Sequence, residues 1–491
     1  MKKRALALLL ATVMLTSSFA ACSKDDDKTK APEKTEGAKT TLAPGETKAP
    51  GETKAPGETE EATTQTVPAN VVTGDENADN PFYVYSWNTE IGDRLKYFLD
   101  DPENADVKNR IIYVNTGGTD HYQGKMDALL GDTSNKQYPD LMGLEADYIL
   151  KYTASKHILP IADLGITEED YKEMYQYTLD IATADGVLKG LSWQAAPGAM
   201  IYRTDYAEKV FGTSKPEDIQ KEFATWDKML EAAEKIKKEY GEEVALFSGP
   251  DDVARVFMAA RKEAWVDADN KLVIDPELEK YLDFNKALYE NEYTKKTTQW
   301  SDAWNANAKE GVFAYMGCTW FLQWTIKPNS GGNAPGEGSY GLWNMCQGPQ
   351  PYYWGGTWLS ATAGCSDKEL AGRIIKYMTC NEETLKKILK KDLDYVNSAK
   401  AVQAVIDEMN DPANKAEAEK LYDFLGGQNH LEVFKEWAED VEVKITRYDL
   451  SINGAFQDAV TAYAQGTLTK EKALEQFKKT VKDTYEAIEV E

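Results

Sequence analysis

Hydrophobic positions follow three different patterns along this chain of 491 residues. A first apolar run, Ala5–Leu15, follows basic residues and is too short for a membrane-spanning helix, which needs roughly 20 apolar residues. Residues 23–80 offer almost no apolar side chain, and from residue 81 onward short apolar runs alternate with segments of helical period. Alternating strand and helix patterns predict an α/β fold with a mainly parallel sheet.

The predicted strands are rich in aromatic and β-branched residues, and they span 81–87, 110–114, 139–144 and 198–202. The predicted helices carry apolar residues at helical spacing, and they span 90–100, 122–130, 147–154, 225–240, 251–263, 367–378, 381–390 and 471–488. About 410 residues follow the N-terminal segments, which is long for a single core and natural for two lobes.

The end of the first apolar run resembles a bacterial lipobox. The sequence SFAAC at 18–22 places two small residues directly before a cysteine, although Phe19 stands where the pattern prefers Leu. The resemblance implies a lipoprotein signal peptide over 1–21 and a lipid on Cys22. The mature chain would then be anchored to the outer face of the cytoplasmic membrane of a Gram-positive bacterium. The alternative is an ordinary secretory signal that a cysteine happens to follow.

Residues 22–80 have the composition of a spacer between that anchor and the folded part. The hexapeptide APGETK occurs at 43–48 and at 49–54, and a third copy, at 55–60, ends in Glu60. A segment with so few apolar side chains cannot offset the entropy of ordering. We therefore predict a lipid-anchored, disordered linker.

The charge and the motif content exclude several classes of function. The chain carries 82 acidic and 56 basic residues, for a net charge of −26. Because nucleic acids and anionic membrane surfaces are bound by basic patches, we expect no nucleic-acid partner. Three histidines, and cysteines without a C-x-x-C pair, argue against a zinc site, so we predict neither a metal nor a cofactor. The sequence contains neither a G-x-S-x-G nor an H-E-x-x-H motif, so it lacks these two signatures of a hydrolase.

Short motifs follow one another through the folded part in a recognisable order. They are YVYSWN at 83–88, PDL at 139–141, LPIADL at 159–164, DGVLKGLS at 185–192, IYRTD at 201–205, TWDKML at 225–230, GVFAYM at 311–316 with Trp320, KELA at 368–371 and the segment 466–474. Each is weak alone, but in this order the series resembles the extracellular solute-binding proteins of carbohydrate ABC transporters, the family of maltose-binding protein. Leu188 and Ser192 replace the Tyr and Pro that are usual in the fourth motif.

The resemblance implies a two-lobed, periplasmic-binding-protein-like fold with a hinge and a ligand cleft between the lobes. It divides the chain into lobe 1, at 81–188 and 341–380, and lobe 2, at 189–340 and 381–491. The chain would cross between them near Gly190 and near 340–341. The resemblance further implies a monomeric receptor without enzymatic activity. This receptor would capture a carbohydrate, by its many aromatic residues an oligosaccharide, and deliver it to an ABC transporter permease.

Candidate ligand contacts stand where predicted strands end, because open α/β sheets bind ligands outside the carboxyl ends of their strands. Sugar rings present apolar faces and hydroxyl groups, which aromatic rings and carboxylates or amides complement. The aromatic candidates are Trp87, Trp193, Trp320, Trp324, Trp354 and Trp358. The polar candidates are Asn88, Glu90, Asp147 and Asn453. For Asp147 the alternative is a helix cap, and for a tryptophan it is the core, which we expect for Trp226.

Three other classes of function remain open. A surface-anchored glycoside hydrolase would need two carboxylates in the cleft, for which Glu145 and Asp147 are the candidates. An adhesin or sensory partner would bind a protein rather than a small solute. A carrier of peptides or amino acids would need a cation for the ligand carboxylate, and Arg203 and Arg255 are the candidates.

Overall fold

A computed structural model describes residues 74–490 of the chain. The predicted signal peptide, Cys22 and most of the predicted spacer lie outside the described residues. The described part starts before the expected boundary at 81, and the backbone N–H of Asp75 donates to the carbonyl of Asn109 over 2.9 Å. Within 74–490, no helix is long and apolar enough to cross a bilayer.

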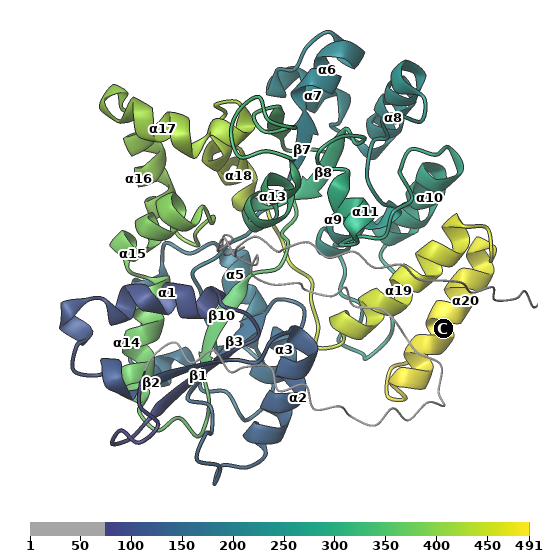
Figure 1. Ribbon diagram of the computed structural model, residues 1–491. Helices are drawn as coiled ribbons and strands as arrows, with labels where there is room; N and C mark the ends of the chain where they lie inside the picture. Colours follow the sequence, from purple (N-terminus) through teal and green to yellow (C-terminus); the bar gives the residue numbers. More distant parts are fainter. Residues whose placement is uncertain (1–73, 491) are drawn as a thin grey trace, which may run out of the picture. The chain divides into compact units, whose positions relative to one another are not determined.

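The first sheet has five strands in the order β2-β1-β3-β10-β6 (Figure 1). Its strands are β1 (Phe82–Ser86), β2 (Ile111–Asn115), β3 (Leu141–Glu145), β6 (Leu191–Ser192) and β10 (Thr357–Ala361). Strand β1 is parallel to β2 and β3, whereas β10 is antiparallel to β3 and β6. Every residue of β1 is buried, as in parallel strands covered on both faces. The predicted alternation of strands and helices is confirmed, with an antiparallel strand added from late in the chain.

The second sheet has three antiparallel strands in the order β8-β7-β9. They are β7 (Ala199–Arg203), β8 (Ala314–Gly317) and β9 (Trp343–Cys346), and a separate hairpin pairs β4 (Thr183–Ala184) with β5 (Val187–Leu188). The chain therefore changes sheets at 193–198, between β6 and β7, and at 347–356, between β9 and β10. Both segments lie a few residues beyond the crossings expected near Gly190 and 340–341.

The crossing segments pair with one another and form the connection between the sheets. Isolated bridges join Pro197 to Tyr353, from the two crossings, and Gln194 to Val396, from a third segment. The first sheet and the helices that contact it form lobe 1, and the second sheet and its helices form lobe 2.

Helices pack around both sheets. In the first half of the chain they are α1 (Glu90–Leu99), α2 (Thr119–Leu130), α3 (Ile149–Thr153), α4 (Glu168–Tyr171), α5 (Gln176–Ile181), α6 (Thr204–Phe211), α7 (Pro216–Glu222) and α8 (Trp226–Tyr240). Those that follow are α9 (Ala254–Ala259), α10 (Pro276–Glu290), α11 (Asp302–Ala306), α12 (Thr319–Phe321), α13 (Lys327–Asn329), α14 (Lys368–Thr379), α15 (Glu382–Lys387), α16 (Ala399–Asn410), α17 (Lys415–Leu421), α18 (His430–Ala438), α19 (Asp449–Ala464) and α20 (Lys470–Thr484). Figure 1 shows α1 and α14 side by side at the first sheet, and α19 packs on both α10 and α20.

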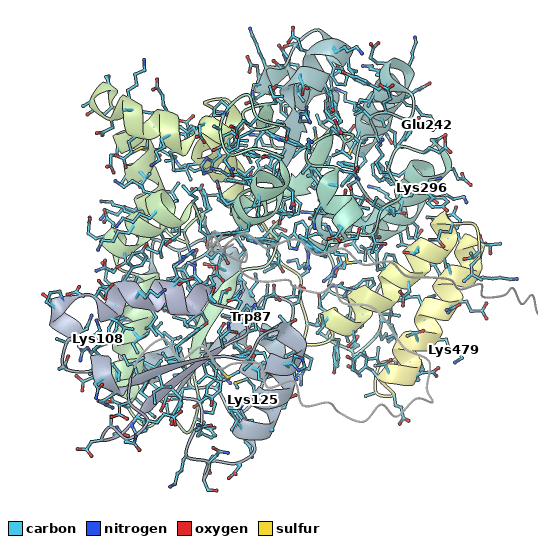
Figure 2. The ribbon with its side chains drawn as sticks, viewed as in Figure 1. Trp87, Lys108, Lys125, Glu242, Lys296 and Lys479 are labelled. Atoms are coloured by element: carbon cyan, nitrogen blue, oxygen red, sulfur yellow. The ribbon has the colours of Figure 1, made fainter. Side chains whose placement is uncertain are left out.

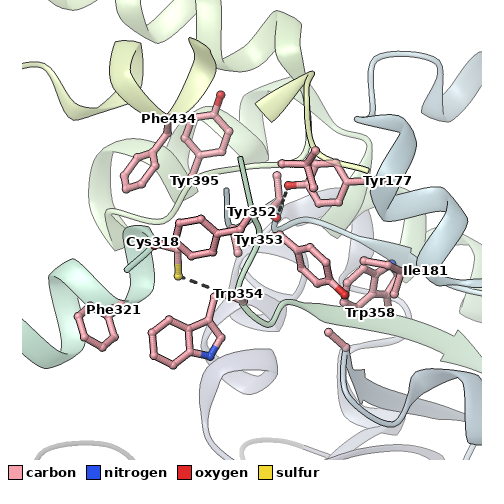
Figure 3. Packing of buried hydrophobic residues seen from close by; sticks show 14 of the residues in the cluster. Tyr177, Ile181, Cys318, Phe321, Tyr352, Tyr353, Trp354, Trp358, Tyr395 and Phe434 are labelled. Atoms are coloured by element: carbon pink, nitrogen blue, oxygen red, sulfur yellow. Dashed lines mark hydrogen bonds between the residues drawn. The ribbon is translucent and has the colours of Figure 1, made fainter. Parts of the chain in front are cut away.

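A cluster of buried aromatic side chains fills the region where the crossing segments meet (Figure 3). The hydroxyl of Tyr352 donates to the carbonyls of Ala199, at 2.9 Å, and of Gly317, at 3.2 Å, both in the second sheet. Close packing explains Gly198, because a Cβ there would lie 2.1 Å from the Tyr352 ring. The second crossing is thus held against the strands of lobe 2 by a buried tyrosine.

Candidate functional site

A pocket lies beside the carboxyl end of β3, where segments distant in the sequence meet. Its lining residues are Ala146, Asp147, Leu150, Lys151, Arg255, Met258, Ala259, Tyr353, Ile445, Thr446, Arg447, Asp449 and Asn453. The space that a water-sized molecule can occupy among them is small, about 20 Å³. The position agrees with the expectation that ligands bind outside strand ends.

Asp147 and Arg255 form an ion pair in this pocket. Nη1 of Arg255 donates to Oδ1 of Asp147 at 2.6 Å, and Nη2 donates to Oδ2 at 3.0 Å, which is the strong bidentate geometry. Asp147 follows β3 of lobe 1, whereas Arg255 lies on α9, whose preceding turn contacts β8 of lobe 2. Burial alone would raise the pKa of Asp147, but the charge and hydrogen bonds of Arg255 outweigh burial and lower it.

Glu145, the last residue of β3, lies next to this pair. Its Oε2 accepts a 2.7 Å hydrogen bond from the backbone N–H of Asp147. Burial, and then the charge of Asp147, raise the pKa of Glu145 to about 8, although Arg255 opposes them. Both effects favour the protonated form of the Glu145 carboxyl in the folded protein.

Tryptophans from three segments form a cluster beside the ion pair. Nε1 of Trp320 donates to the carbonyl of Trp354 at 2.8 Å, and their rings meet edge to face with centroids 5.4 Å apart. Trp300 stacks on Trp320 at 6.3 Å, and the Arg255 guanidinium lies 5.9 Å from the Trp354 ring. Trp354 is 7% exposed, so a ligand ring could stack on it only after its neighbours move.

Gly355 joins this cluster to the carboxylates. A Cβ at Gly355 would lie 3.3 Å from Oε1 of Glu145 and 3.6 Å from Nε1 of Trp320. The backbone of Gly355 has φ +69°, a left-handed conformation that glycine adopts without strain. Two of the predicted stacking residues, Trp320 and Trp354, thus lie beside Glu145 and Arg255, although neither lines the pocket.

Asn453 forms the opposite wall of the pocket on α19. Its Oδ1 accepts hydrogen bonds from Nε1 of Trp265, at 2.7 Å, and from Nη1 of Arg261, at 3.1 Å. The structure therefore brings two of the predicted polar residues, Asp147 and Asn453, to one pocket. Lys151 and Arg447 lie at the same pocket, and Lys151 also pairs with Asp127 at 2.7 Å.

Trp87 lies in the core of lobe 1 rather than at the pocket. Its ring is 5% exposed and meets Tyr122 and Tyr148 edge to face, and Figure 2 shows it among the side chains near the end of β1. Asn88 follows it, and its Oδ1 accepts from the backbone N–H of Glu90 at 3.0 Å, which anchors the start of α1. Neither side chain reaches the pocket residues.

Glu90 belongs to a buried network at the connection between the sheets. Its carboxylate accepts from Oγ1 of Thr357 at 3.0 Å and from Nε2 of Gln194 at 3.4 Å. Gln194 donates in turn to Asp394 at 2.7 Å. Burial, and then the charge of Asp394, raise the pKa of Glu90 to about 7. Glu90 thus belongs to this connection and is not among the residues that line the pocket.

None of the six predicted tryptophans is among the lining residues of the pocket, and Trp193, Trp324 and Trp358 also lie outside the cluster beside the ion pair. Trp193 is fully buried, and Trp358 is 1% exposed with its Nε1 donating to the carbonyl of Thr178 at 2.9 Å. Trp324, in contrast, is 54% exposed on a π-helical turn. A tryptophan at a strand end lines a pocket only if no other element covers it, and α5 covers Trp358 through Thr178. Trp226 is half-buried and packs against the core, where its ring stacks on Phe257 at 3.9 Å.

Sequence reasoning missed several pocket residues. Tyr353 could have been found, because it directly precedes Trp354 in the aromatic segment around Gly355. Arg447 carries no local signal, and neither does Arg261, which lies outside the pocket and contacts Asp449 and Asn453 across 188 and 192 positions. Arg203, weighed as a ligand-binding cation, instead pairs with its neighbour Asp205 at 2.8 Å.

The described part of the chain contains no arrangement of side chains suited to metal binding or redox chemistry. Among residues 74–490, no group of three or more His, Cys, Asp or Glu side chains is arranged to hold a metal ion. The cysteines of this part, Cys318, Cys346, Cys365 and Cys380, are free thiols. Burial raises the pKa of each thiol, so none is an activated nucleophile.

Comparison with known proteins identifies the family. The sequence pattern of the bacterial extracellular solute-binding proteins matches residues 103–418. The chain belongs to this family. A curated relative, a lactose-binding protein of Rhizobium radiobacter, is 25% identical over 342 residues, which are 69% of this chain and 76% of the relative.

Solved structures of solute-binding proteins share the fold. An extracellular solute-binding protein of family 1 is 19% identical, with a TM-score of 0.69 over 82% of this chain and 99% of the other. The ABC transporter associated binding protein from B. animalis subsp. lactis Bl-04, in complex with β-1,6-galactobiose, is 17% identical, with a TM-score of 0.63 over 84% of this chain and 100% of the other. The family and the two-lobed α/β fold predicted for this solute-binding protein are thereby confirmed.

Proposed function

We propose that this solute-binding protein captures an oligosaccharide in the pocket at Asp147 and Arg255 and delivers it to the permease of an ABC transporter. The observation that carries the proposal is the meeting of a bidentate charged pair, the amide of Asn453 and a tryptophan cluster at one place. Charged and amide groups hydrogen-bond sugar hydroxyls, and tryptophan faces cover the apolar side of a sugar ring. The relatives that bind lactose and β-1,6-galactobiose support this class of ligand.

The ligand contacts proposed for this site are fewer than the sequence predicted. They are Asp147, Arg255, Asn453, Trp320 and Trp354, with Tyr353 as an addition. Because Asp147 and Arg255 come from different lobes, a ligand that engages both favours the state in which the lobes are close. The crossings at 193–198 and 347–356 are the proposed hinge.

Glycoside hydrolysis is a second candidate because the pKa values of Glu145 and Asp147 are driven apart, as in an acid–nucleophile pair. Against it, both oxygens of Asp147 are held by Arg255, and the two carboxylates are adjacent rather than across a cleft. Incubation with nitrophenyl glycosides tests this, and we expect no release of nitrophenol; release that Glu145→Gln abolishes would favour the hydrolase.

A glycan panel tests the proposed function. The panel contains lactose, β-1,6-galactobiose, lacto-N-biose, maltotriose, cellotriose and xylotriose, and binding is followed by thermal stabilisation and tryptophan fluorescence. A bound glycan stabilises the folded state by about 2.7 kcal/mol at a hundred times its dissociation constant. Arg255→Met serves as the matched control, in which the response should vanish. If no member of the panel binds the wild-type protein, the carbohydrate proposal fails.

The membrane anchor is proposed separately, because Cys22 lies outside the described residues. We propose that a lipid on Cys22 holds the protein at the outer face of the cytoplasmic membrane, with the following spacer giving it reach toward the permease. Mass spectrometry of the mature N-terminus should find a lipid-modified Cys22, and Cys22→Ser should release the protein into the medium. An unmodified Cys22, or cleavage at another position, would overturn the anchor.

A further inference from the structure

Arg261 makes a set of contacts that joins α9 to the approach and start of α19. It lies just beyond the end of α9 and is 2% exposed. Its Nη2 donates to the carbonyl of Lys444 at 2.7 Å and to Oδ2 of Asp449 at 2.5 Å, and its Nη1 donates to Oδ1 of Asn453 at 3.1 Å. A buried guanidinium stays charged and can only donate, so these acceptors must face it.

The same contacts fix the orientation of the Asn453 amide. Oδ1 of Asn453 receives a second hydrogen bond, from the indole N–H of Trp265 at 2.7 Å. An amide nitrogen in that place would face two donors, so the oxygen must point toward Trp265 and Arg261. The amide nitrogen is left with no acceptor among residues 74–490, on a residue that lines the pocket.

Asp449, which also lies on α19 and lines the pocket, already accepts hydrogen bonds from the protein through both of its carboxylate oxygens. Its Oδ1 accepts from the backbone N–H of Thr446 at 2.7 Å and from the Thr446 hydroxyl at 2.9 Å. Its Oδ2 accepts from Arg261. Both oxygens of this carboxylate are thus engaged within the protein, and the amide nitrogen of Asn453 is the unpaired donor group among the α19 residues that line the pocket.

We propose that Arg261 is a positioning residue that makes Asn453 a hydrogen-bond donor toward the bound carbohydrate. This wall then selects a sugar oxygen that accepts a hydrogen bond. The inference rests on the proposed function, because the acceptor is an atom of the captured glycan. Arg261 itself does not line the pocket, and its proposed effect on the ligand passes through the orientation of Asn453.

Calorimetric titration of the mature protein with lactose and with whichever other panel glycans stabilise the wild type tests the inference. Asn453→Asp keeps Oδ1 for Trp265 and Arg261 but replaces the NH2 group, the only donor group of this side chain, by an oxygen. We expect at least a tenfold loss of affinity without a loss of thermal stability. Asn333→Asp, on an exposed loop, adds the same charge away from the pocket and should leave the affinity unchanged.

A double-mutant cycle separates positioning from a general structural role. Arg261→Lys should weaken binding in the wild-type background, because the amide of Asn453 is then no longer held in place. It should cause no further loss in the Asn453→Asp background, because that variant has no amide donor to position. Wild-type affinity in Asn453→Asp, or losses that add in the double variant, would overturn the inference alone. If the wild type binds no glycan of the panel, the proposed function fails and the inference fails with it.

Discussion

The carboxylate of Asp147 and the guanidinium of Arg255 face each other through two hydrogen bonds, although 108 positions separate them in the sequence. Their side chains are 24% and 25% exposed, so the pair is neither a solvent-screened surface contact nor sealed in the core. It links lobe 1 to lobe 2 at the place where the ligand is proposed to bind. A ligand there must share these groups or exchange its own hydrogen bonds for theirs.

Arg255→Met should lower the free energy of unfolding by about 1–3 kcal/mol, because it leaves Asp147 as an unpaired charge in a partly buried pocket. Urea denaturation measures this loss. Lys479→Met is the matched control, because Lys479 pairs with Asp483 at 2.5 Å while both side chains are 75% and 63% exposed. Equal stability of the two variants would show that the interlobe pair contributes no more than a surface pair.

Glu145→Gln should remove a pH dependence of stability. The pKa of Glu145 is raised from 4.5 to about 8 in the folded protein, so the folded state binds the proton more tightly than the unfolded state. Its contribution to stability is complete below the unfolded pKa and is lost as the pH rises through about 8. Glutamine mimics the protonated form, so the variant and the wild type should have equal urea midpoints at about pH 4 and differ at about pH 9, where the variant is more stable. Parallel midpoints across this range would contradict the raised pKa.

Trp320 and Trp324, one helical turn apart, should respond differently to removal of the ring. Trp320→Ala should destabilise the fold by about 2–4 kcal/mol, because the half-buried ring packs on Trp354 and hydrogen-bonds its carbonyl. Trp324→Ala should change stability by no more than about 0.5 kcal/mol, since its ring is 54% exposed. Chemical denaturation measures both, and the binding response should be lost only in Trp320→Ala. Equal effects of the two changes would remove Trp320 from the site.

Local sequence patterns predict the strands and the candidate residues that stand at their ends. Which of these candidates lie at the pocket depends on contacts between segments that are distant in the sequence. The sequence predicts Asp147 as a candidate because it follows β3, a short buried run, and the structure places it at the pocket. Trp358 also stands in a strand near the same edge, but α5 covers it through a carbonyl 180 positions away. No periodicity indicates which strand-end tryptophan a distant helix will cover. The hydrogen bond from Arg261 to Asn453 could not be predicted for the same reason, because nothing in the local sequence of either residue indicates a partner 192 positions away.

Gly355→Ala should destabilise the protein by about 1–2 kcal/mol, because alanine is strained at the φ of +69° that Gly355 adopts. The new Cβ would also lie 3.3 Å from Oε1 of Glu145, a contact tighter than usual, so the carboxyl or the neighbouring Trp320 must shift. We therefore expect weaker glycan binding together with the loss of stability. Gly124→Ala, within α2 and with open space around its Cβ, is the matched control and should stabilise the protein by up to about 1 kcal/mol. Urea denaturation of both variants compares them directly. Stabilisation of Gly355→Ala to the level of Gly124→Ala would mean that the segment at Gly355 relaxes freely and does not hold Glu145 against the tryptophans.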